Sequence, residues 1–292
     1  MPQPTDLVLG PVRLQPAELA VMAIVNRTPD SFYDGGANLD LADARDAVRR
    51  AVDEGAVIVD VGGVRAGSVG APVGEDEELA RVLPVVEFAR GAFPDVAISV
   101  DTWRSGVARA AAAAGADLVN DTWQGADQDV VAVAAETGLG LVCSHTGGLA
   151  PRTDPHQVDY DDVVADVTAT VTAAAERAVA AGVRADGILV DPTHDFGKTT
   201  YHSLELTSRL DELVATGWPV LVALSRKDFV GETLGLPTSE RLEGTLAATA
   251  ISAWLGARVF RAHDVRATRR VLEMVASIVG TRPPSAARRG LG

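Results

Sequence analysis

The sequence has little of several things, and each scarcity excludes a class of protein. Its 292 residues include one cysteine, Cys143, so no disulfide can form within the chain. Leu141 and Val142 precede this cysteine, and such an apolar setting indicates buried packing rather than catalysis. No apolar run approaches the roughly 20 residues of a membrane-spanning helix, and no signal-like segment opens the chain. We therefore expect a soluble, cytoplasmic protein without a membrane partner.

Positive charge is also scarce. The chain has 26 Lys and Arg against 40 Asp and Glu, which gives a formal net charge of -14. General binding to nucleic acid or to a membrane surface needs clustered positive charge, so we expect neither partner. An anionic small molecule would need a local basic pocket, which Lys227 and Arg261 could supply.

Several catalytic motifs are missing as well. The five histidines show no His-x-x-x-His spacing, so a zinc site is not expected. The sequence has no Gly-x-Ser-x-Gly elbow and no Walker loop, which argues against serine hydrolases and P-loop nucleotide hydrolases. The first predicted strand is followed by Asn-Arg-Thr-Pro instead of a Gly-x-Gly-x-x-Gly turn, so a dinucleotide-binding fold is not favoured.

What the chain does contain is a repeated alternation of short apolar runs and longer helical stretches. After a small hairpin at 7–14, buried strands are predicted at 21–25, 57–61, 97–100, 118–119, 140–144, 187–190, 220–224 and 258–260. Helices are predicted at 41–54, 75–90, 105–115, 161–181, 204–215, 239–255 and 265–279, with Asp40 and Ser105 as N-caps of the first and third. The alternation predicts an α/β fold, a (β/α)8 TIM barrel with a short N-terminal hairpin. Residues 1–280 would form a single domain and 281–292 a disordered tail, with an open doubly wound sheet as the alternative fold.

Polar residues follow nearly every predicted strand. Because the C-terminal ends of barrel strands meet at one face, these residues should converge there: Asn26, Asp101, Asn120, His145, Asp191, Lys227, Arg261 and His263. Carboxylates, amides and a lysine suit a flat heterocycle with N–H donors and a carbonyl. A guanidinium and an imidazole suit phosphate oxygens, and the oxygen of Asn26 suits Mg²⁺. For any single Asp or Asn the alternative is a turn former or helix cap, and for His145 a structural role is favoured.

Several of these stretches together resemble the dihydropteroate synthases of folate biosynthesis. The first loop, Asn26–Gly36, differs from the family's Asn-Val-Thr-Pro-Asp-Ser-Phe-Ser-Asp-Gly-Gly only at Arg27 and Tyr33. Further matches are Ile-Ser-Val-Asp-Thr at 98–102, Val-Asn-Asp at 119–121, Asp-Pro at 191–192, Phe-Gly-Lys at 196–198, Ser-Arg-Lys at 225–227, Arg-Leu-Glu-Gly-Thr-Leu-Ala-Ala at 241–248 and Arg-Ala-His-Asp-Val at 261–265. They occur in the family's order from about residue 21 to 265.

The resemblance implies a transferase that condenses a dihydropterin pyrophosphate with 4-aminobenzoate and releases pyrophosphate. It implies that Asp101, Asn120, Asp191 and Lys227 hold the pterin, and that Phe196 and Ser225 line the aminobenzoate pocket. Asn26, Arg261 and His263 would serve Mg²⁺ and pyrophosphate, and Lys227, Arg261 and His263 are the candidate catalytic residues. The family generally forms dimers through its last helices, so a homodimer is expected, with the Ala-rich helix at 245–255 in the interface.

The departures from the family pattern lie on the second-substrate side. After Gly62 and Gly63 the family has Glu-Ser-Thr-Arg-Pro-Gly, where this chain has Val-Arg-Ala-Gly at 64–67. After Asp191-Pro192 the family's Gly-Ile-Gly is replaced by Thr193, His194 and Asp195, which adds bulk and a carboxylate. The loop after His145 lacks the family's arginine, and Asp228 replaces a serine, where it could pair with a neighbouring cation. These changes predict a divergent second-paralogue type of synthase.

Three hypotheses follow from the sequence. The first is a protein that binds a dihydropterin pyrophosphate but makes dihydropteroate weakly or not at all, or joins the pterin to another nucleophile. Asp195 would repel the aminobenzoate carboxylate if it faced it. The second is a fully active synthase in which Arg65 replaces the missing loop arginine. The third is a non-catalytic pterin-binding or interaction module. A folate–corrinoid methyl carrier ranks lower, because Ser-Arg-Lys and Arg-Ala-His suit pyrophosphate.

Overall fold

The computed structural model describes residues 6–27, 41–65, 72–153 and 158–289. Eight parallel strands in these residues form one sheet with the spatial order β8-β7-β6-β5-β4-β3-β10-β9. The strands are β3 (Ala20–Asn26), β4 (Ile58–Gly62), β5 (Ala97–Asp101), β6 (Leu118–Asp121), β7 (Gly140–Ser144), β8 (Ile188–Asp191), β9 (Leu221–Val222) and β10 (Val259–Ala262). A parallel bridge between Val190 and Val220 joins β8 to the segment leading into β9. The sheet is therefore closed, which confirms the predicted barrel and rules out the open sheet.

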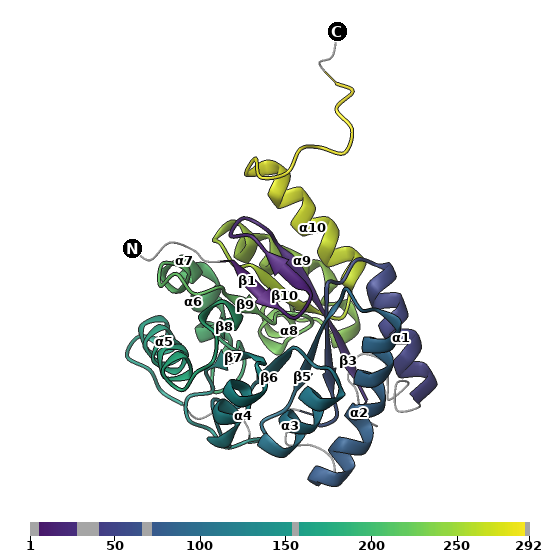
Figure 1. The fold of residues 1–292 in the computed structure, drawn as a ribbon. Coiled ribbons are helices and arrows are strands. Elements are labelled where there is room, and N and C mark those ends of the chain that lie inside the picture. The colour runs from purple at the N-terminus through teal and green to yellow at the C-terminus, as the bar shows by residue number, and fades with distance from the viewer. Residues whose placement is uncertain (1–5, 28–40, 66–71, 154–157, 290–292) are drawn as a thin grey trace.

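Helices surround the barrel (Figure 1). They are α1 (Leu41–Asp53), α2 (Glu75–Ala92), α3 (Ser105–Ala114), α4 (Asp129–Thr137), α5 (Val163–Ala180), α6 (Thr200–Ser208), α7 (Leu210–Val214), α8 (Asp228–Leu234), α9 (Leu242–Trp254) and α10 (Val265–Ile278). The described residues also include single-turn 3₁₀ helices at Ala185–Gly187 and Thr238–Glu240. In the described part of the chain, no helix combines the length and apolar character needed to cross a membrane.

The structure corrects the predicted helices in four places. Helices α4 and α8 were not predicted, and the predicted helix at 204–215 is two helices separated at Arg209. Ser105 is not an N-cap, because the helix already begins at this residue and Arg104 occupies the cap position. The Ser105 backbone N–H donates instead to Asp127 Oδ2 at 2.8 Å, so a carboxylate distant in sequence satisfies it. The predicted cap Asp40 lies outside the described residues.

The N-terminal hairpin closes the barrel at the end opposite the expected site (Figure 1). Strands β1 (Leu7–Leu9) and β2 (Val12–Leu14) pair antiparallel through a turn at Gly10 and Pro11, as predicted. Leu7 and Leu9 are at most 1% exposed and pack in one cluster with barrel residues such as Met22 and Ile58. These residues fill the barrel interior, while two further clusters lie between the sheet and the helices. The core thus leaves the C-terminal strand ends for polar side chains.

Candidate functional site

The register of the strands sets three of the predicted residues, together with Gly62, in order around the barrel mouth. Asn26 pairs in register with Gly62, Gly62 with Asp101, and Asp101 with Asn120. These are the last or nearly last residues of β3 to β6, so they lie at one level of the barrel. A Cβ at position 62 would come within 2.6 Å of Asn26 Oδ1, so glycine there makes room for the Asn26 amide. The sequence prediction that strand ends converge is therefore supported by the register.

A buried carboxylate that the sequence analysis missed lies at the centre of this group. Asp60, in the middle of β4, is 0% exposed. Its oxygens accept hydrogen bonds from Ser99 Oγ at 2.5 Å, Asn120 Nδ2 at 3.2 Å and Arg261 Nε at 2.6 Å. A buried charge is tolerated only when it is paired and hydrogen-bonded, and these three donors meet that condition. Asp60 therefore fixes the positions of Asn120 and Arg261.

Arg261 joins Asp60 to a second carboxylate. Its Nη2 donates to Asp101 Oδ2 at 2.7 Å, and Thr122 Oγ1 donates to Asp101 Oδ1 at 3.0 Å. Burial raises the pKa of Asp101 to about 6, while the positive charge of Arg261 opposes that rise. Near pH 6 this carboxyl can therefore change between hydrogen-bond acceptor and donor. Both predicted residues lie in the site, but in this structure the guanidinium contacts carboxylates.

Lys227 and Asp191 form the opposite side of the site. Lys227 Nζ donates to the backbone oxygen of His194 and lies 4.9 Å from the centroid of the Phe196 ring. Burial lowers the pKa of Lys227, and the neighbouring carboxylates of Asp195 and Asp191 oppose that effect. Burial likewise raises the pKa of Asp191, against the charge of Lys227. The predicted residues Asp191, Phe196 and Lys227 are therefore neighbours.

The loop after β8 adopts a backbone that favours glycine. Thr193, Asp195 and Gly197 have φ angles of 53°, 70° and 62°. A positive φ is uncommon for any residue with a side chain and an outlier for a β-branched one such as Thr193. A Cβ at Gly197 would lie 2.2 Å from the backbone oxygen of Thr146, so only glycine fits there. The chain thus keeps a conformation suited to Gly-Ile-Gly while carrying Thr193 and Asp195.

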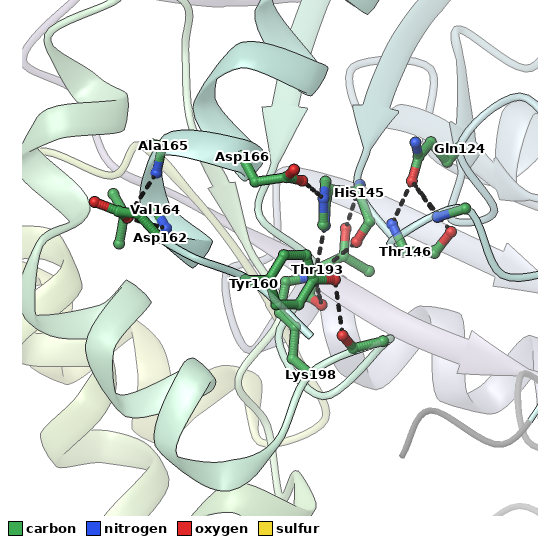
Figure 2. Close-up of polar contacts among 12 residues, drawn as sticks. Gln124, His145, Thr146, Tyr160, Asp162, Val164, Ala165, Asp166, Thr193 and Lys198 are labelled. Atoms are coloured by element: carbon green, nitrogen blue, oxygen red, sulfur yellow. Dashed lines mark hydrogen bonds and ion pairs between the residues drawn. The ribbon is translucent and has the colours of Figure 1, made fainter. Parts of the chain in front are cut away.

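A buried lysine holds this strained loop in place (Figure 2). Lys198 is 3% exposed, and its Nζ donates to the backbone oxygens of His145 at 2.8 Å, Phe196 at 2.9 Å and Thr193 at 3.2 Å. It also lies 2.9 Å from His145 Nδ1, and His145 Nε2 lies 2.7 Å from Asp166 Oδ1. Strain at a site persists only where its surroundings enforce it, and these contacts do so.

The charges of this cluster follow from its burial. Burial and the charge of Lys198 lower the pKa of His145 to about 4, so its ring is neutral at ordinary pH. Burial and the charge of Lys227 lower the pKa of Lys198 to about 7. A neutral His145 that donates from Nε2 to Asp166 can accept from Lys198 at Nδ1. Tyr160 completes the support by donating to the backbone oxygen of Gly197 at 2.8 Å. The structural role favoured for His145 fits this geometry.

The remaining predicted residues, Ser225 and His263, contact each other. His263 Nδ1 lies 3.0 Å from Ser225 Oγ, and the His263 backbone N–H donates to the same hydroxyl at 3.3 Å. Next to them, Arg226 forms an ion pair with Asp264 at 3.0 Å. The ends of β9 and β10 are thereby tied together, and Ser225 orients the imidazole.

Helix α2 and Arg104 border the second loop, whose residues 66–71 lie outside the described part. Glu78 is 0% exposed and forms an ion pair with Arg104. Arg104 Nη2 also donates to the backbone oxygen of Val73 at 2.8 Å. A Cβ at Gly63 would lie 2.9 Å from Val82 and 3.2 Å from Glu78, so α2 packs directly on this glycine. Arg104 is therefore committed to Glu78 and does not replace the missing loop arginine.

The oxygen donors at the barrel mouth decide whether the site suits Mg²⁺. Among the described residues, no group of three or more His, Cys, Asp or Glu side chains could hold a metal ion. Mg²⁺ does not require such a cage, since it keeps several waters and commonly binds one protein oxygen together with substrate phosphates. Asn26 Oδ1, at the barrel mouth above Gly62, is chemically suited to that single role. The residues therefore fit Mg²⁺ that arrives with a phosphorylated ligand.

A (β/α)8 barrel that gathers polar side chains at its C-terminal strand ends has the architecture in which many proteins bind a small molecule at that face. Comparison with known proteins narrows that group. Residues 22–263 match the family described as pterin binding enzyme. The chain therefore belongs to the pterin binding enzyme family.

Named relatives agree with this assignment. A Mycobacterium leprae protein called inactive dihydropteroate synthase 2 is 64% identical over 275 residues, which cover 93% of this chain and 94% of the relative. The Escherichia coli dihydropteroate synthase is 40% identical over 255 residues, covering 87% and 90%. Among solved structures, a Yersinia pestis dihydropteroate synthase in complex with a sulfonamide drug superposes with a TM-score of 0.89 at 35% identity, covering 95% of this chain and 100% of that one. The resemblance inferred from the motifs is confirmed, including its second-paralogue character.

Proposed function

We propose that this protein binds a dihydropterin pyrophosphate and condenses it onto 4-aminobenzoate weakly or not at all. The observation that carries the pterin half is the hydrogen-bonded group around Asp60, which orients Asn120 and Arg261 and, through Arg261, Asp101. Such an arrangement of buried, oriented polar groups is typical of a site for a flat polar ligand. The family assignment supports the same ligand class.

The pterin would be held by four residues on two sides of the barrel mouth. On one side, the carboxylate of Asp101 accepts ring N–H groups and the amide of Asn120 donates or accepts. On the other side, Asp191 accepts from the 2-amino group and Lys227 donates to the ring carbonyl. The pKa of Asp101, about 6, and the raised pKa of Asp191 imply that both carboxyls benefit from new N–H donors. Binding of the heterocycle should therefore lower both pKa values.

The pyrophosphate would lie near the ends of β3 and β10. We assign Asn26 as the protein ligand of Mg²⁺, with His263 and Arg261 as donors to the phosphate oxygens. Ser225 orients the His263 ring at 3.0 Å. When bound, Mg²⁺ neutralises charge on the pyrophosphate and makes it a better leaving group. Lys227, close to the ring of Phe196, would donate a hydrogen bond to the pterin ring carbonyl and so hold the ring in position while the pyrophosphate leaves.

The condensation is expected to be weak because the second-substrate side is altered. The loop arginine of the family is missing, and Arg104 is paired with the buried Glu78. Losing a cation that meets transition-state charge costs on the order of 3 kcal/mol, or roughly a hundredfold in rate. The 64% identical Mycobacterium leprae relative is named an inactive synthase, which agrees with this expectation.

We also propose that residues 1–280 act as one domain and that the chain forms a homodimer in the cytoplasm. Four exposed apolar side chains on neighbouring helices α9 and α10 support the dimer: Ile251 (50% exposed), Trp254 (61%), Met274 (61%) and Ile278 (58%). Exposed apolar side chains gathered on neighbouring helices are typical of an interface.

The test combines binding with turnover. Calorimetry with dihydropterin pyrophosphate and Mg²⁺ should detect saturable binding to the wild-type chain, at least roughly tenfold weaker for Asp191→Asn because a charge-assisted acceptor is lost. Asp186→Asn is the matched control, since Asp186 lies just before the N-terminal end of β8, away from Asp191 at its C-terminal end. No binding to the wild-type chain would refute the pterin assignment.

Turnover is measured as pyrophosphate release with and without 4-aminobenzoate, beside the Escherichia coli synthase. We expect release below about 1% of that enzyme's rate, from the hundredfold cost above. Release at the rate of the Escherichia coli enzyme would instead identify an active synthase, and Arg65→Ala should then abolish it.

A further inference from the structure

The carboxylate of Asp195 occupies two backbone donors at the start of α8. Its Oδ2 accepts from the backbone N–H of Asp228 at 2.7 Å and of Phe229 at 3.3 Å. Its Oδ1 accepts from Ser203 Oγ at 3.1 Å, and the Asp195 backbone N–H donates to the same hydroxyl at 3.1 Å. The side chain thus bridges the loop after β8 to the first turn of α8, and these two amide donors are already satisfied.

The position of this carboxylate is enforced. Asp195 has a φ of 70°, which an aspartate adopts only at a cost, and it follows Thr193 with a φ of 53°. The loop cannot relax easily, because Lys198 binds the backbone oxygens of Thr193 and Phe196, on either side of Asp195. Tyr160 holds Gly197 at 2.8 Å. The negative charge is therefore fixed in position, close enough to Lys227 to act on it, rather than on a side chain that moves away.

The charges around Phe196 disfavour the binding of an additional anionic ligand. Lys227 lies 4.9 Å from the Phe196 ring, and the carboxylates of Asp195 and Asp191 act on its charge, each opposing the lowering of its pKa by burial. The next cation along the chain, Arg241, pairs with Asp228 at 2.8 Å. Two carboxylates, of Asp195 and Asp228, therefore border α8, and the nearby cations that could attract an incoming anion already have partners.

We propose that Asp195 is a specificity-determining residue that excludes carboxylate-bearing aryl amines, so that the second ligand is an aromatic amine without an anionic group. This inference rests on the proposed pterin-binding function, which supplies the first ligand of the site. The aromatic ring of the second ligand stacks on Phe196. A carboxylate on that ring, however, meets the carboxylate of Asp195, and the amides of Asp228 and Phe229 that could bind it are already occupied. A carboxamide of the same shape carries no charge and suffers no such repulsion.

The test compares two ligands of nearly identical shape, 4-aminobenzoate and 4-aminobenzamide, by calorimetry. The oxidised pterin alcohol and pyrophosphate are present with Mg²⁺, so that the site is filled but cannot react, and each titration is repeated without them. The wild-type chain should bind the amide at least tenfold more tightly than the acid. Asp195→Asn, which keeps the side-chain shape and tolerates a positive φ, should remove that preference, and Asp195→Gly should reverse it.

Asp186→Asn serves as the charge-matched control and should leave the preference unchanged. Equal affinity of the wild-type chain for acid and amide would overturn the inference, as would a preference that survives in Asp195→Asn. No heat with either amine, with or without the pterin and pyrophosphate, would overturn it too. Failure to bind the pterin, together with an amide preference that Asp195→Asn removes, would refute the proposed function while supporting the role of Asp195.

Discussion

Replacement of Arg261 by methionine should destabilise the protein in a strongly pH-dependent way. The guanidinium is the shared partner of Asp60 and Asp101, at 2.6 Å and 2.7 Å, and side-chain exposures are 0% for Asp60 and 19% for Asp101. Breaking a buried ion pair by removing one partner costs about 3–5 kcal/mol of unfolding free energy. Native proteins are stable by only about 5–15 kcal/mol, so this is a large fraction of the total.

The pH dependence follows from the sign of the pKa change. Burial already raises the pKa of Asp101 to about 6, and removing Arg261 takes away the charge that opposes this rise. A carboxyl with a higher pKa in the folded state destabilises that state as pH rises from its unfolded pKa, about 3.9, through its folded one. The deficit of Arg261→Met should therefore be larger at pH 8 than at pH 5.

Urea unfolding followed by circular dichroism at pH 5 and pH 8 measures both quantities. Arg266→Met is the matched control, because Arg266 is 61% exposed and its pair with Glu54 lies on the surface. That control should change the unfolding free energy by less than about 0.5 kcal/mol at either pH. A deficit for Arg261→Met below about 1 kcal/mol at pH 8, or one equal at both pH values, would contradict the reasoning, since a buried pair costs more.

Three further outcomes are expected. Because folding lowers the pKa of His145 to about 4, the wild type should lose unfolding free energy as pH falls from about 6.5 to about 4, and the His145→Gln variant should not. The variant should therefore gain up to roughly 3 kcal/mol relative to the wild type over this range, and an offset between their urea curves that stays constant with pH would contradict this. Gly197→Ala should cost roughly 2 kcal/mol or more in denaturant unfolding, because its φ is 62° and the new Cβ meets Thr146; an unchanged midpoint would refute the close approach. Trp254→Glu should convert a dimer into a monomer in light scattering, whereas a wild-type monomer would refute the proposed interface.

The barrel was predictable because each strand and helix carries its own local signal. The apolar run at 140–144 coincides with β7, and the predicted hairpin at 7–14 turns where expected. Short helices carry too little periodicity to be recognised, which is why α4 and α8 were missed. Ser105 was assigned as a cap from its residue type, but Asp127, distant in sequence, satisfies the amide instead.

The site was only partly predictable, because strand ends show which residues converge but not which of them bind one another. The notable signal that was overlooked is Asp60, a carboxylate inside an apolar strand, which had to have buried partners. The sequence raised the possibility that Asp195 faces the second substrate. Its contacts with the amides of Asp228 and Phe229 depend on how the loop after β8 meets α8, and that geometry is tertiary. The prediction that Asp228 pairs with a cation is confirmed by its contact with Arg241.

The barrel has a seam. Between β8 and β9 the described residues pair through the single bridge from Val190 to Val220, whereas β3 and β4 share five register pairs. Asp191 ends β8 and Lys227 follows β9, so the two residues lie on opposite sides of that seam. A heterocycle bound by both residues would link β8 to β9 at the place where the barrel strands share the fewest pairs. Such a ligand would stabilise the closed barrel against unfolding at this place. A protein that binds the ligand without turning it over would still gain this stability from it.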